Sequence, residues 1–118
     1  MFLERLSKIS GRIEDAQALS LVAKDGIPVE SLSSRSDLDL ETLAAELVAQ
    51  AQAISSDHRE LGVGEVQQFS VTTDRYTFVV SSVADDYYLL LVLGKRGSYG
   101  KARFELRRAR LLFEGDLS

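Results

Sequence analysis

The chain has 118 residues, enough for one domain with one hydrophobic core, and 45% of them are hydrophobic. It has no cysteine and one histidine, which excludes disulfides and thiol chemistry and removes the ligands of the usual structural zinc sites. The net charge is −4, but residues 1–60 hold eleven acids and six bases, whereas residues 95–118 hold three acids and seven bases. We expect one domain over residues 1–118 with two electrostatically different surfaces, no metal and no cofactor.

The N-terminal segment predicts no secretory leader, because Glu4, Arg5 and Lys8 are followed by no apolar run. The longest apolar run, residues 87–93, is too short to cross a bilayer as a helix. We therefore expect a cytoplasmic protein without membrane insertion.

The first element is predicted to be a short helix. Phe2, Leu6 and Ile9 recur at helical spacing, which is typical of an amphipathic helix. We expect this helix to run from Phe2 to about Ile9 and to end near Gly11.

A hairpin is predicted next. The apolar runs 18–23 and 27–29 flank Asp25-Gly26, a pair typical of tight turns because glycine accepts a positive φ at no cost. Pro28 has no N–H to give to a strand ladder, so we expect the second strand to lie at a sheet edge or to begin at Pro28. Residues 31–36 are rich in serine and predict a loop.

Residues 40–61 form the clearest predicted element, a helix of about six turns. Asp37 or Asp39 can cap its start, and Gly62 can end it. Its apolar stripe comprises Leu40, Leu43, Ala44, Leu47, Val48, Ala51 and Ile54, extended by His58 and Leu61.

Three strands and a final helix are predicted to follow. We expect strands over residues 66–73, 76–83 and 87–93, the last apolar on both faces and therefore central in its sheet. A loop over residues 94–100 leads to a helix over residues 101–113. The predicted class is α+β, an α/β sandwich of order α-β-β-α-β-β-β-α with a five-stranded antiparallel sheet.

A search for catalytic groups finds none. His58 lies on the apolar stripe of the long helix, so we expect it to have a packing role rather than to act as a general base. Residues 55–58 read Ser-Ser-Asp-His, but neighbours in a helix point in different directions and cannot form a triad. Asp85-Asp86 is interpreted as a turn. The Gly-rich loop 94–100 lacks the spacing of a phosphate-binding loop.

The last predicted helix carries an alternative function. Arg103, Arg107 and Arg110 share one side, and such a stripe can bind nucleic acid or anionic lipid. Because the whole chain is acidic and no aromatic residues alternate with these arginines, we do not expect nucleic acid as the partner. A solvated face, or one that meets an acidic protein, is the favoured interpretation.

Two stretches resemble the Roadblock family of dynein roadblock light chains and bacterial MglB-like regulators. Residues 18–29, with their Asp-Gly turn, are similar to the family's first hairpin. Residues 86–93 and 100–109 are similar to its last strand, Gly-containing loop and final helix. The element order matches as well, whereas the polar segment 11–15 departs from the Gly-rich approach common in relatives.

The resemblance implies a homodimer or heterodimer in which the long helices lie together and the third strands pair. It also implies a non-enzymatic module that binds, scaffolds or regulates a small Ras-like GTPase and holds no nucleotide itself. On that basis we expect a dimer interface at Leu47, Ala51, Ile54, His58, Gln68, Ser70 and Thr72, and partner binding at Glu41, Glu46, Gln50 and Arg59.

Other interpretations stay open at this point: a profilin-like or longin-like relative, a structural subunit of a larger complex, and an enzyme whose catalytic residues form no recognisable motif.

Overall fold

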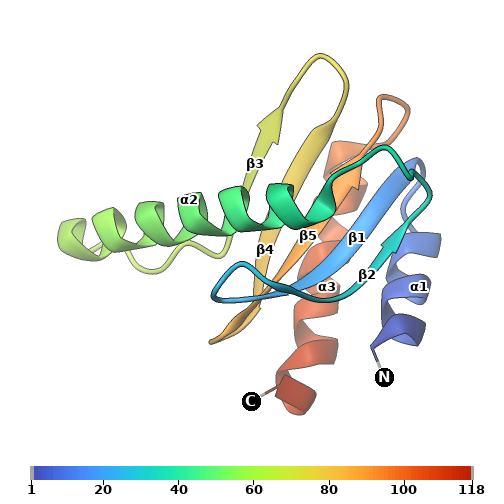
Figure 1. Cartoon of the computed structure of the whole chain (residues 1–118). Helices are drawn as coiled ribbons and strands as arrows, with labels where there is room; N and C mark the ends of the chain where they lie inside the picture. Colours follow the sequence, from blue (N-terminus) through green and yellow to red (C-terminus); the bar gives the residue numbers. More distant parts are fainter. Residues whose placement is uncertain (1, 118) are drawn as a thin grey trace.

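The computed structural model describes residues 2–117, without the side chains of residues 57–59 and 114–117. Three helices and five strands follow one another along the chain (Figure 1). In chain order they are α1 (Leu3–Gly11), β1 (Ala16–Ala23), β2 (Pro28–Ser33), α2 (Leu40–Leu61), β3 (Gln68–Thr72), β4 (Thr77–Ala84), β5 (Tyr87–Leu93) and α3 (Tyr99–Leu117). The predicted fold class and element order are confirmed.

The strands form one antiparallel sheet in the order β2-β1-β5-β4-β3. The central position predicted for residues 87–93 is confirmed, because β5 pairs with β1 on one side and with β4 on the other. Pro28 opens the edge strand β2, as its missing N–H requires. The opposite edge is β3.

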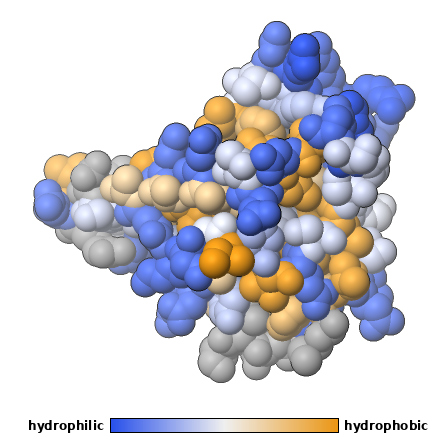
Figure 2. All heavy atoms as spheres, viewed as in Figure 1, coloured by the Kyte–Doolittle hydropathy of each residue, from blue (hydrophilic) through white to orange (hydrophobic). Residues whose placement is uncertain are grey.

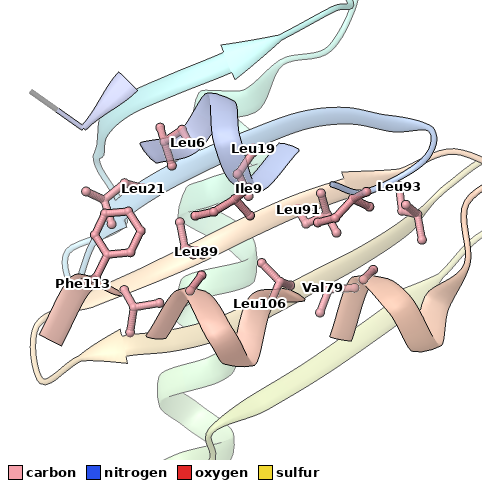
Figure 3. Packing of buried hydrophobic residues seen from close by; sticks show 14 residues of the cluster. Leu6, Ile9, Leu19, Leu21, Val79, Leu89, Leu91, Leu93, Leu106 and Phe113 are labelled. Atoms are coloured by element: carbon pink, nitrogen blue, oxygen red, sulfur yellow. The ribbon is translucent and has the colours of Figure 1, made fainter. Parts of the chain in front are cut away.

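Helices cover both faces of the sheet. Alternate residues of each strand point to opposite faces, so each face builds its own core. On one face, Leu89 and Leu91 of β5 pack with Leu6 of α1 and with Leu106 and Phe113 of α3 (Figure 3). On the other face, Leu90 packs beneath α2 in a second cluster with Val22, Ala44, Leu47, Val48, Ala51 and Val80.

Individual residues at the turn of the β1–β2 hairpin and at the two ends of α2 stabilise these elements. Gly26 has φ +87°, and a Cβ there would come within 3.1 Å of the Ala45 Cα, so the β1–β2 turn lies tight against α2. Asp39 caps α2, because its carboxylate accepts hydrogen bonds from the Thr42 N–H (3.1 Å) and the Thr42 hydroxyl (2.7 Å). Gly62 follows the helix with φ +70°, the left-handed conformation typical of a helix end.

Several sequence-based expectations are wrong in detail, and the strand expected over residues 66–73 spans only Gln68–Thr72. Ser31–Ser33, predicted as a loop, belong to β2, where serine is tolerated because an edge strand has solvent on one side and Ser31 hydrogen-bonds Ser20 (2.7 Å). The α2 stripe ends earlier than predicted, since Leu61 is 72% exposed. The last helix begins at Tyr99, two residues before its predicted start, and runs to Leu117.

Candidate interaction surfaces

The outer side of α2 forms a polar platform, defined here as Glu41, Glu46 and Gln50 together with a row of small residues. Ala45, Ala49 and Ala53 lie exposed between the polar side chains. A band of weakly hydrophobic residues flanked by hydrophilic ones runs along α2 in Figure 2. Three of the four residues predicted to bind a partner therefore lie together in solvent, and the Arg59 side chain is outside the described residues.

The inner side of α2 packs against the sheet. Leu47 and Ala51 are 7% and 2% exposed and belong to the cluster over Val80 and Leu90, so little of either side chain is left for a second copy. Ile54 is half-buried. The His58 side chain is outside the described residues. The C-terminal turns of α2 project past the β3 edge of the sheet (Figure 1).

The β3 edge brings together the three polar residues expected at a dimer interface. In and beside β3, the backbone groups of odd-numbered residues hydrogen-bond to the neighbouring strand β4. The Thr73 N–H donates to the Tyr76 carbonyl, and the Gln67 carbonyl accepts from the Ser82 N–H. Strand alternation then turns the backbone N–H and C=O groups of Gln68, Ser70 and Thr72 outward, along the sheet edge.

Two of these edge residues contact α3 through their side chains, whereas the Thr72 hydroxyl shares a hydrogen bond with Thr77 of β4 (3.1 Å). Gln68 accepts a hydrogen bond from the Arg103 guanidinium (3.0 Å), and Ser70 shares one with the Tyr99 hydroxyl (2.7 Å). The Arg103 guanidinium carbon lies 5.5 Å from the Tyr99 ring centroid, within cation–π range. These contacts join the exposed edge strand to the basic helix.

A groove between α3 and the β3–β4 edge contains the arginine stripe found in the sequence. Arg103, Arg107 and Arg110 line it together with Gln68 and Ser81, and its volume is about 480 Å³. Sequence reasoning missed a second feature of α3, three exposed large apolar side chains at Phe104, Leu111 and Leu112. Helical spacing could have revealed them, because they lie on another side of the helix than the buried positions Ala102, Leu106, Ala109 and Phe113.

Loops at one end of the sheet enclose a shallow hollow of about 510 Å³ with basic walls at Arg35, Arg75, Lys95 and Arg96. Part of this charge is neutralised within the chain. The hydrogen bonds from Arg35 (3.0 and 2.8 Å) hold the pKa of Asp37 below its ordinary value and raise the pKa of Arg35 in turn.

Solved structures share this fold. The chain superposes on the gliding protein MglB from Thermus thermophilus with a TM-score of 0.83 at 21% identity, over 92% of this chain and 82% of that one. For a Roadblock/LC7 domain from Streptomyces avermitilis the TM-score is 0.84 at 18% identity, over 95% and 93%. For MglC from Myxococcus xanthus it is 0.71 at 29% identity, over 98% of both chains. No protein-family model and no curated protein matches the sequence.

The fold and these structural matches define a Roadblock-type α/β sandwich with an open edge strand and helices on both faces of the sheet. The chain has the fold of the Roadblock domain, as the sequence resemblance indicated, and it is similar to MglB and MglC over nearly its whole length.

Proposed function

We propose that the chain acts in the cytoplasm as a homodimeric module that binds a small Ras-like GTPase and regulates or tethers it without being an enzyme. The observation that carries this proposal is the polar platform on α2, which is exposed and rich in small residues between Glu41, Glu46 and Gln50. A platform of this kind suits a protein partner better than a small molecule, which needs a concave pocket.

The dimer part of the proposal rests on β3. Its outward backbone groups at Gln68, Ser70 and Thr72 offer a template for the same strand of a second copy. Antiparallel pairing there would continue the sheet and bring the projecting turns of the two α2 helices, with Ile54 and His58, toward each other. One of the similar structures is MglB with a tetrameric arrangement, and this likeness supports self-association of the present chain.

The test is a panel of purified Ras-like GTPases, each loaded with GDP or with a non-hydrolysable GTP analogue. We expect the chain to bind one nucleotide state preferentially, and Glu46→Lys to weaken that binding on the order of tenfold or more. Glu14→Lys is the matched control, since it makes the same charge change at an exposed site before β1. No binding across the panel, or equal effects of the two variants, contradicts the proposal.

A second candidate, nucleic-acid binding, is favoured by the groove that Arg103, Arg107 and Arg110 line. Phosphate contacts predict an affinity that falls steeply with salt. Titration of duplex DNA and RNA at two salt concentrations, beside the GTPase panel, separates the two functions. Salt-sensitive binding of nucleic acid with no bound GTPase would replace the platform proposal.

A further inference from the structure

The outward side of α3 carries exposed apolar side chains among arginines. Phe104 is 58% exposed, Leu111 73% and Leu112 51%. Phe104 and Leu111 are seven residues apart, two helical turns, and therefore share one side of the helix. Arg107 and Arg108 lie between them in solvent, and the Arg108 guanidinium carbon is 6.0 Å from the Phe104 ring centroid. We call Arg103, Phe104, Arg107, Arg108, Leu111 and Leu112 the α3 face.

The α3 face continues onto α1 through a basic hollow. Lys8 and Arg12 of α1, with Arg108, Leu111 and Leu112, line a depression of about 400 Å³ between the two helices. Glu105 adds little negative charge to this surface, because its side chain is 5% exposed and pairs with Arg108 (3.5 Å) and Arg12 (4.0 Å). The local charge is therefore positive although the chain as a whole carries −4.

We propose that the α3 face docks the protein onto an anionic membrane surface. Arginines attract anionic headgroups, while phenylalanine and leucine side chains that protrude between them enter the boundary between headgroups and acyl chains. Within residues 2–117 no helix is long and apolar enough to cross a membrane, so the contact is peripheral. A nucleic-acid duplex would leave Phe104, Leu111 and Leu112 in water.

The proposed dimer strengthens this inference, which to that extent rests on the proposed function. The two-fold axis that relates antiparallel β3 strands stands perpendicular to the sheet. Both α3 faces would then lie on one side of the assembly, and both α2 platforms on the other. A planar bilayer can engage two such faces at once, which raises the overall affinity above that of one face. The platforms would remain open toward the cytoplasm.

The experiment is sedimentation of the full chain with vesicles of phosphatidylcholine, pure or with about a third phosphatidylglycerol. We expect the protein to pellet with the anionic vesicles, to stay in solution with the neutral ones, and to be released as salt rises from about 0.1 M to 0.5 M. Phe104→Ser with Leu111→Ser, and separately Arg107→Glu with Arg108→Glu, should each lower the partition coefficient on the order of tenfold or more.

Two controls match these variants. Ile27→Ser removes a large apolar side chain that is 63% exposed in the β1–β2 turn, and Lys24→Glu with Lys95→Glu makes the same charge change at two exposed lysines outside the α3 face. Both should bind the anionic vesicles within about threefold of the unchanged protein, since the long-range charge effect is screened at 0.1 M salt. Circular dichroism verifies that each variant is folded.

Three outcomes would overturn the inference: no sedimentation with anionic vesicles, equal loss in the controls and the α3 variants, or binding of duplex DNA without binding of vesicles. Sedimentation velocity on the same samples keeps the dimer question separate. If the protein is a dimer that does not bind vesicles, membrane docking is refuted but the dimer is not. If it is a monomer that binds vesicles, the dimer is refuted but docking through the α3 face is not.

Discussion

The carboxylate of Asp15 accepts a hydrogen bond from the backbone N–H of Arg96, 81 residues further along the chain (2.9 Å). The Asp15 carbonyl accepts a second one from the Gly94 N–H (2.9 Å), and its carboxylate also takes a hydrogen bond from Gln17. Asp15 holds φ at +61°, a left-handed conformation that Asp tolerates better than most residues. One side chain thus joins the segment before β1 to the loop that leads into α3.

Asp15→Ala should lower the free energy of unfolding by about 2–3 kcal/mol, because it leaves the Arg96 N–H without its acceptor and places alanine at a positive φ. Asp15→Asn should cost less, since asparagine accepts the same φ and offers an oxygen acceptor. Urea unfolding of the three proteins measures the difference. Equal losses in the two variants would show that the carboxylate geometry is unimportant.

Gly94→Ala should destabilise the fold by about 1–3 kcal/mol, because the new Cβ would overlap the Asp15 carboxylate. The clash is with one side chain, so the cost should shrink when Asp15→Ala is present. The double-mutant cycle should therefore show a coupling of about 0.5–3 kcal/mol. If the losses of stability in Gly94→Ala and Asp15→Ala simply add in the double variant, the strain in Gly94→Ala does not come from the Asp15 side chain.

The cap of α2 should make stability depend on pH. The hydrogen bonds from the Thr42 hydroxyl and N–H hold the pKa of Asp39 below its ordinary value of 3.8. A carboxyl whose pKa is lower in the folded state stabilises the fold above its ordinary pKa, and this contribution is lost as pH falls through the folded value. The stability gap between the unchanged protein and Asp39→Ala should therefore shrink below about pH 4.

Chemical unfolding from pH 7 down to pH 3 tests this expectation. Asp39→Asn is the control, because its amide can still cap the helix but does not titrate. A gap to Asp39→Ala that stays constant over the whole range would mean that ionisation of the cap is irrelevant.

Ser70→Pro should abolish the proposed dimer and spare the monomer fold. The Ser70 N–H points out of the sheet edge, so proline removes a donor that β4 does not use and blocks pairing with another strand. Ser70→Ala keeps the N–H and should remain dimeric, although it loses the bond to Tyr99. Sedimentation equilibrium at micromolar concentration should show at least a tenfold weaker dimer for Ser70→Pro. A 13.0 kDa species for the unchanged protein would refute the dimer itself.

A variant suggested by sequence periodicity alone would not give this information. Ala51 belongs to the apolar stripe of α2, so Ala51→Arg looks like an interface probe. In the fold Ala51 packs against the sheet and only 2% of it is exposed. An arginine at this position would therefore unfold the chain rather than separate two copies.

Periodicity determined the elements of this protein. Residues 40–61 and 87–93 were placed with their observed bounds, because a 3.6-residue or two-residue repeat of apolar side chains is a local property of the chain. The central position of β5 followed as well, since a strand apolar on both faces needs a helix layer on each. The Asp-Gly turn and the Gly62 helix end depend on positive φ, which is also local.

Tertiary structure alone decided which distant residues meet. Nothing in the local pattern pairs Asp15 with Arg96, or Gln68 with Arg103, because those contacts depend on how loops and helices pack around the sheet. Ser31–Ser33 are extended as a strand because they pair with β1. Leu111 and Leu112 stay exposed because the sheet accepts only one side of α3, and that side is filled by Leu106 and Phe113. A residue's spacing sets which side of its helix it occupies, whereas the packing of the remaining elements decides whether that side is covered.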